Sequence, residues 1–127
     1  MQQSFEVEPI HIGAQSTVSI KYGPDVLAAM PLLVGRIKAG FKPTSNTAAL
    51  LFTVDSNVSP ASVVRIPLVD DPDGCVAMIS LVLTSVQTAL IAQSSVMFDV
   101  ICFNGAEAIR VPGTWSWPVD RPITPIA

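Results

Sequence analysis

The densest group of potential metal ligands is the acidic sequence Asp70-Asp71-Pro72-Asp73-Gly74. Three neighbouring carboxylates could bind Ca²⁺, which takes hard oxygen ligands. The spacing of an EF-hand loop is absent, however, and no acidic residue follows at its twelfth position. The alternative is a β-turn in which Pro72 fixes φ at the second position and Gly74 occupies the fourth. We therefore expect a turn here and no bound metal ion.

Side chains suited to catalysis are sparse. His11 is the only histidine and falls in a predicted terminal arm, yet a Ser-His-Asp triad would have to use it. A G-x-S-x-G nucleophile motif is absent. Asp99 lies inside an apolar strand, where burial can raise a carboxyl pKa as it does in active sites. We instead expect a structural carboxylate paired with Arg110 on the adjacent strand, and we predict neither an enzyme nor a cofactor.

The two cysteines, Cys75 and Cys102, both fall in predicted strands. The N-terminus has no signal-peptide pattern, so we expect the thiols to stay reduced and to pack as small buried hydrophobic groups. A disulfide between neighbouring strands is the alternative. A metal-binding pair is not expected, because the chain has no C-x-x-C motif.

Three aromatic residues, Tyr22, Trp115 and Trp117, could form the stacking platform of a carbohydrate-binding module. Trp115 and Trp117 share a strand face with Ile109 and Val111, so we expect them to pack in the core instead.

The composition shows unusually little charge. Charged residues make up 13% of the 127 residues, hydrophobic residues make up 50%, and the net charge is −3. Such a chain is not intrinsically disordered and folds as one domain. Arg36, Lys38 and Lys42 are too few for nucleic-acid binding, and no apolar run is long enough for a membrane helix. A surface with so little charge is expected to be covered by protein partners.

Short segments of alternating hydrophobicity predict an all-β fold. Turn-forming residues separate them, as in an antiparallel Ig-like β-sandwich. A capping box at Thr84-Ser85-Val86-Gln87 predicts one short helical turn over 86–92, and Asn104-Gly105 predicts a hairpin turn. The seven predicted strands are 16–22, 32–41, 47–55, 63–69, 75–83, 96–103 and 107–117.

The segment 63–69 is predicted to be an edge strand, because Pro67 has no N–H to donate to a neighbouring strand. Its alternation places Val64, Ile66 and Leu68 toward the core and Arg65 toward solvent.

The strands 75–83 and 96–103 are apolar on both faces, and 47–55 has no distinct polar face. A sandwich strand with one solvated face should alternate. We therefore expect an arm, a long loop or another subunit to cover the second face. The predicted contacts on these outward faces are Leu51, Met97, Ile101 and Phe103.

Both ends of the chain are predicted to be docking arms on a domain formed by residues 14–117. Residues 1–13 form the N-terminal arm. Residues 118–127 contain three prolines and are expected to be extended, which reduces the entropy lost on binding. The predicted arm contacts are Phe5, Val7, Ile10, Ile12, Val119, Ile123 and Ile126.

Three motifs in the second half of the chain occur in a fixed order. The first starts at Gly74 and reads Gly-x-x-x-x-Ile-x-Leu-x-Leu-Thr-x-x-Gln-Thr-Ala. The second is Phe98-Asp99-Val100, and the third, from Ile109, reads Ile-Arg-Val-x-Gly-Thr-Trp-x-Trp. In this order they resemble the small β-sandwich domain of tailed-phage virion proteins, best described as the N-terminal domain of upper baseplate proteins of lactococcal-type phages.

Baseplate members of that group continue into a long helical or receptor-binding region, whereas this chain has one domain. The resemblance therefore implies a non-enzymatic virion protein, most simply a capsid decoration or cement protein that reinforces the head. A tail, baseplate or fibre adaptor and a carbohydrate-binding module are the alternatives. The expected partners are capsid or tail proteins and further copies of the chain, with a trimer as one option. The protein would be made in the bacterial cytoplasm and reside in the virion.

Overall fold

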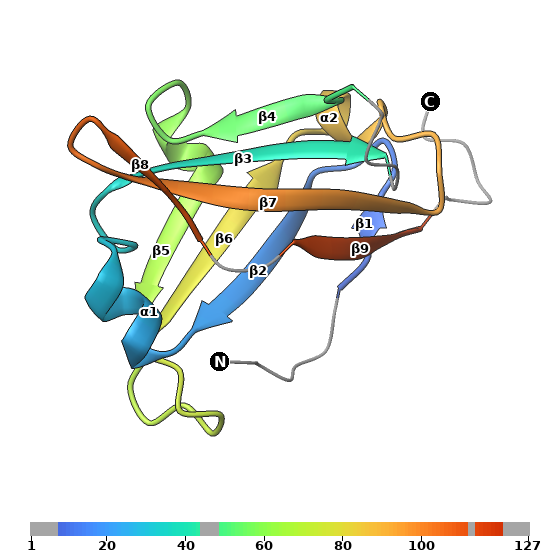
Figure 1. The fold of residues 1–127 in the computed structure, drawn as a ribbon. Helices are drawn as coiled ribbons and strands as arrows, with labels where there is room; N and C mark the ends of the chain where they lie inside the picture. The colour runs from blue at the N-terminus through green and yellow to red at the C-terminus, as the bar shows by residue number, and fades with distance from the viewer. Residues whose placement is uncertain (1–7, 44–48, 112–113, 121–127) are drawn as a thin grey trace.

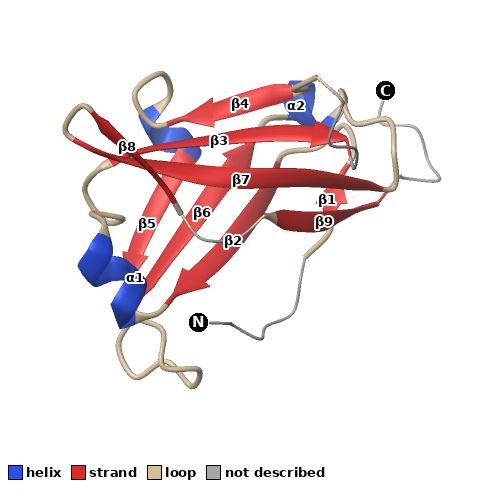
Figure 2. Cartoon of the chain, viewed as in Figure 1, coloured by secondary structure: helices blue, strands red, loops and turns tan. Residues whose placement is uncertain are grey.

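A computed structural model of the chain describes residues 8–43, 49–111 and 114–120, which form two sheets and two short α-helices (Figures 1 and 2). The strands are β1 (Ile10–His11), β2 (Ser16–Tyr22), β3 (Arg36–Pro43), β4 (Phe52–Asp55), β5 (Val63–Pro67), β6 (Ala77–Leu83), β7 (Ser95–Asn104), β8 (Glu107–Arg110) and β9 (Trp115–Asp120). The helices are α1 (Pro24–Ala29), α2 (Ser85–Thr88) and the 3-10 helix η1 (Pro60–Ser62).

The larger sheet is built around β7, in the order β1-β9-β7-β3-β4. Strand β3 runs antiparallel along one edge of β7. The other edge carries β9 beside the first part of β7 and β8 beside its second part. Strand β1 pairs in parallel with β9, so this sheet is mixed. The predicted strand 107–117 is therefore divided into β8 and β9, and β9 continues to Asp120.

The smaller sheet, β2-β6-β5, is antiparallel and crosses behind the larger one (Figure 1). The chain is mostly β, as predicted. The prediction of an antiparallel Ig-like sandwich goes further than the fold does, because the larger sheet is mixed and curls like half of a barrel.

The core lies between the two sheets and follows the predicted alternation. Val18 and Ile20 of β2 and Ile37 of β3 are 0–1% exposed. The Phe41 ring stacks on those of Phe52 and Phe98, each at 4.8 Å between centroids. These contacts attach β4 and β7 to β3 through side chains as well as backbone hydrogen bonds.

The predicted orientation of 63–69 is wrong by one residue. Val63 is 7% exposed, whereas Val64 and Ile66 are 42% and 38% exposed. Val63 pairs with Leu81, whose side chain is buried in the core, so its own side chain points inward as well. The edge position is confirmed, because β5 is the last strand of its sheet.

The N-terminal residues 8–13 belong to the domain rather than to a separate arm. Ile10 is 0% exposed, and the Trp117 indole N–H donates a hydrogen bond of 2.7 Å to the Glu8 carbonyl. On the other side of β1, the Gly13 N–H donates to the Thr88 hydroxyl (3.1 Å). The predicted contacts Phe5, Val7, Ile123 and Ile126 lie outside the described residues.

The predicted local signals at α2 and at the hairpin are confirmed. The Thr84 hydroxyl accepts from the Gln87 N–H, and the Gln87 side chain accepts from the Thr84 N–H. Helix α2 ends earlier than the predicted range 86–92. Gly105, with φ of +65°, forms the turn between β7 and β8. Among the described residues, both α-helices are far too short to cross a membrane.

Candidate functional site

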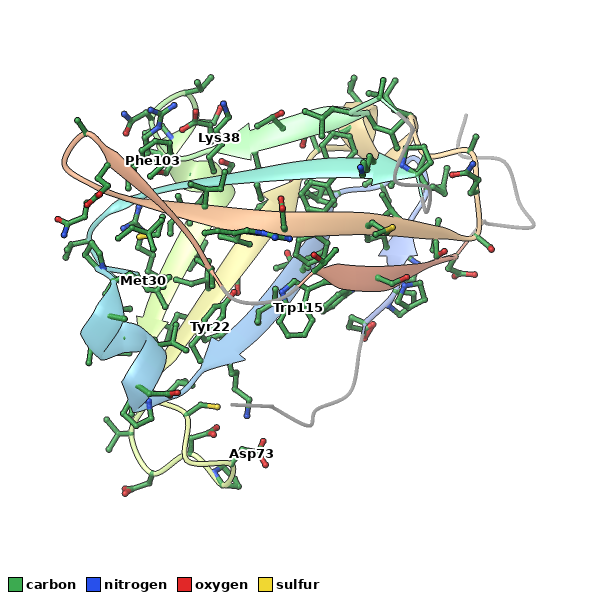
Figure 3. The ribbon with its side chains drawn as sticks, viewed as in Figure 1. Tyr22, Met30, Lys38, Asp73, Phe103 and Trp115 are labelled. Atoms are coloured by element: carbon green, nitrogen blue, oxygen red, sulfur yellow. The ribbon has the colours of Figure 1, made fainter. Side chains whose placement is uncertain are left out.

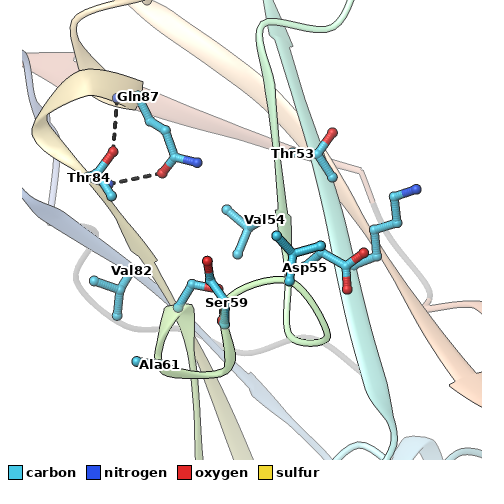
Figure 4. A pocket seen from close by; sticks show the side chains of 11 residues that line it. Thr53, Val54, Asp55, Ser59, Ala61, Val82, Thr84 and Gln87 are labelled. Atoms are coloured by element: carbon cyan, nitrogen blue, oxygen red, sulfur yellow. Dashed lines mark hydrogen bonds between the residues drawn. The ribbon is translucent and has the colours of Figure 1, made fainter.

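A groove of about 490 Å³ lies between strand β4 and the end of β6 (Figure 4). One wall is β4 itself, and the opposite wall is formed by β6 and the start of α2. The floor and rim are completed by the loop that leads into η1. The lining residues are Lys38, Thr53, Val54, Asp55, Val58, Ser59, Ala61, Ser62, Val82, Thr84 and Gln87. We call this the β4–β6 groove.

The backbone of β4 is open toward this groove. The Ser56 N–H donates to the Ile37 carbonyl (2.9 Å). In an antiparallel pair, only every second residue of a strand directs its peptide groups toward the neighbouring strand, and in β4 these are the even-numbered residues. The peptide groups of Thr53 and Asp55 therefore point away from β3. The Asp55 carbonyl accepts from the Val58 and Ser59 N–H groups on that side. Among the described residues, the Thr53 N–H and carbonyl and the Asp55 N–H have no backbone partner.

The carboxylate that lines the groove, that of Asp55, is engaged in a structural ion pair with Arg36. The Arg36 guanidinium donates to both oxygens of Asp55, at 3.0 and 2.6 Å. It also lies over the Phe103 ring, 4.6 Å from the centroid. Hydrogen bonding from Arg36 lowers the pKa of Asp55, and the Asn57 N–H contributes in the same direction. A carboxylate held ionised in this way is poorly suited to general acid catalysis.

The opposite wall is also internally satisfied. Figure 4 shows the Thr84 and Gln87 side chains bonded to the backbone of the capping box rather than pointing freely into the groove. The groove is therefore a partly apolar channel beside an open strand edge, with Val54, Val58 and Val82 on its walls. Its binding capacity lies in backbone groups, in apolar contacts and in the exposed Lys38 side chain.

A second hollow, of about 280 Å³, lies on the outer face of the larger sheet. Gly40 forms part of it, because a Cβ at this position would approach the Leu50 side chain to 2.9 Å. The predicted pair between Arg110 and Asp99 is confirmed, with 3.4 Å between Nε and Oδ2. Both side chains are substantially exposed, so the pair contributes little to stability.

The acidic cluster forms the predicted β-turn. The Gly74 N–H donates to the Asp71 carbonyl (3.0 Å), and the turn projects from one end of the molecule (Figure 3). Lys21 donates to Asp71 at 2.8 Å and to Asp73 at 3.2 Å. The hydrogen bond from Lys21 lowers the pKa of Asp71. The carboxylates thus fasten the loop to β2.

The thiols and aromatic side chains mostly pack inside. Cys75 and Cys102 are both free and buried, and burial raises the pKa of each thiol. Trp117 and Tyr22 are 3% and 5% exposed, and Trp115 packs half-buried against the core. These three residues therefore do not form an exposed sugar-binding platform, and the prediction of core packing is confirmed for the tryptophans.

His11 and Asp120 lie side by side at an exposed position on β1 and β9. Their side chains are 3.3 Å apart and more than half exposed. The Ser16 hydroxyl accepts from the His11 backbone N–H rather than contacting its ring. The His11–Asp120 contact joins β1 to β9 at the edge of the larger sheet. It lacks the geometry of a Ser-His-Asp triad, because the Ser16 hydroxyl does not contact the imidazole ring.

The predicted contact residues divide into three groups. Met97, Ile101 and Phe103 lie half-buried on the outer face of β7, and Leu51 is half-buried before β4. Ile12 and Val119 pack partly against the core, and Ile10 is entirely buried, so Ile10 is not available to a partner. The remaining four lie outside the described residues.

The outer face of the smaller sheet is an apolar surface, part of which the sequence interpretation assigned to the core. Ile66 pairs with Met78, and Val64 with Ser80, so these side chains share the face that points away from the core. We call this surface the apolar outer face. Its members are Val64, Ile66, Leu68, Val76, Met78 and Val82, all exposed or half-buried. The sequence interpretation reversed β5 and therefore assigned half of this surface to the core.

Comparison of the chain with protein-family models, with curated proteins and with solved structures found no match.

Proposed function

We propose that this protein is a non-enzymatic structural protein of a tailed-phage virion, acting as a decoration or cement protein on the head. The observation that carries the proposal is the apolar outer face, which has no cover among the described residues. Together with the ordered motifs that resemble β-sandwich domains of phage virion proteins, it favours a protein that works by adhering to other proteins.

Three polar side chains on this face, those of Ser19, Ser80 and Lys21, already have partners within the chain. The Ser19 and Ser80 hydroxyls hydrogen-bond to each other at 2.9 Å, and Lys21 is held by two carboxylates. An apolar partner could therefore cover these three side chains without leaving a charge or a serine hydroxyl unpaired.

The size of the face favours a partner present in many copies. Three strands about 4.8 Å apart and five residues long cover roughly 250 Å². A stable pairwise interface needs about 800 Å² on each partner. One such contact is weak, but many copies on an ordered particle surface gain strength through multivalency.

The direct test is the copy number of the protein in purified particles. Hundreds of copies on the head, removed by Ile66→Asp but not by the exposed control Val69→Asp, would support the proposal. Copies in the low tens would favour a tail or fibre adaptor. Absence from particles would refute the structural role.

A further inference from the structure

The open edge of β4 provides a binding position that no contact within the described chain uses. Thr53 presents one free N–H and one free carbonyl, and Asp55 adds a second N–H. An exposed strand edge with unpaired peptide groups is a template for an added strand. We propose that residues 121–127 of a second copy of this chain bind in the β4–β6 groove and pair with Thr53.

The short open edge fits a segment interrupted by prolines. Only Thr53 offers both a donor and an acceptor, since the Asp55 carbonyl is already used by Val58 and Ser59. The segment has prolines at 122 and 125, so between them only Ile123 and Thr124 carry an N–H. A longer regular strand would leave most of its own backbone N–H and carbonyl groups unpaired against so short an edge.

The walls of the groove suit the side chains of this segment. Val54, Val58 and Val82 line it, and Val58 is 79% exposed in the single chain. Ile123 and Ile126 would cover these valines. Proline has a fixed φ, so a segment with two prolines has less conformational entropy to lose on binding.

The strand registers exclude the same segment of the same copy. Pro118 pairs with Ser95, which places Asp120 two positions before the start of β7. Thr53 pairs with Gly40, and Gly40 pairs with Asp99, so Thr53 lies level with Asp99. Measured along β7, Thr53 is therefore about six residue positions beyond Asp120. This offset is roughly 20 Å, and the three strand spacings from β9 to β4 add about 14 Å at right angles. The resulting separation of about 25 Å equals the full reach of seven residues, about 24 Å. None of the segment would remain to lie along β4, so the occupant comes from another copy.

The first test is hydrogen exchange of the full chain at several protein concentrations, together with its mass in solution. We expect an oligomer whose Thr53 amide becomes protected as concentration rises, while the amide of Val69, which lies outside the strands and is 84% exposed, provides a reference. A synthetic peptide of residues 118–127 should compete, dissociating the oligomer while keeping the Thr53 amide protected.

The second test uses a matched pair of variants at one residue. Thr53→Pro removes the open N–H without disturbing the β3 ladder, and Thr53→Val keeps the N–H with nearly the same shape. We expect Thr53→Pro to weaken self-association by about tenfold or more and Thr53→Val to leave it nearly unchanged. Ile123→Asp should weaken it as well, because the carboxylate would be buried against valines.

A full chain that stays monomeric at high concentration would overturn the proposal. An oligomer in which the Thr53 amide exchanges as fast as in the monomer would overturn it too. The exchange test does not depend on the folding of any variant. The inference is also independent of the virion role. The protein could be absent from particles and still self-associate through β4, or be present in particles without doing so.

Discussion

The hydroxyl of Thr88 links α2 to the turn between β1 and β2, and its removal provides a sharp test of how the domain is held together. Thr88 is 0% exposed. Its Oγ1 accepts from the Gly13 N–H at 3.1 Å and donates toward the Ala14 carbonyl at 3.0 Å and the Ser85 carbonyl at 3.2 Å. One short side chain thus fastens α2 to the turn between β1 and β2.

Thr88→Val keeps the volume of the side chain and removes these bonds. The Gly13 N–H loses its partner, and the Ala14 carbonyl keeps only the Ser16 hydroxyl at 3.5 Å. The Ser85 carbonyl keeps the Ala89 N–H. A buried group left without a partner costs about 1–3 kcal/mol, so we expect a total loss of about 2 kcal/mol. For 127 residues the entropy of unfolding is roughly 0.27 kcal/mol/K, which converts this loss to a fall of about 7 °C in Tm.

The measurement is urea unfolding followed by circular dichroism, with Tm from calorimetry. The matched control is Thr17→Val on the exposed face of β2, where we expect a change within about 0.5 kcal/mol. Thr88→Ser retains the hydroxyl and should lose less stability than Thr88→Val. If Thr88→Val were as stable as Thr17→Val, the role given to this hydroxyl would be refuted.

Three further outcomes are expected. Tyr22→Phe should leave the free energy of unfolding unchanged or raise it by up to about 1 kcal/mol, because the buried Tyr22 hydroxyl has no hydrogen-bond partner in the described part of the chain; a clear loss in urea titration would contradict this. The pKa of Asp55 is lowered by Arg36, so its stabilisation is complete above the unfolded carboxyl pKa of about 3.9 and is lost as pH falls through the folded value. Asp55→Asn should therefore make stability less dependent on pH below about 4, and an unchanged acid slope would count against the pair. Cys75 and Cys102 should react with a thiol reagent only after unfolding, since both are buried; rapid labelling of the native protein would disprove their placement.

The sequence alone determined much of the local structure, because the relevant signals lie within a few residues. The alternation in β2 and β3 identified their buried faces, since successive strand residues point to opposite sides. The capping box at Thr84 predicted the start of α2, and Pro72 with Gly74 predicted the acidic turn. The low charge predicted a surface covered by partners, and this stays a prediction.

Only the tertiary structure decided which face of an ambiguous strand points inward. In β5, Val63 and Val64 are both apolar, so alternation separates two faces without choosing between them. Pairing of Val63 with Leu81 makes the choice and leaves Val64 and Ile66 outside. The β4–β6 groove depends in the same way on long-range register, because its walls come from strands far apart in the chain. Such pairings are set by packing across the whole core, which no short window of sequence contains.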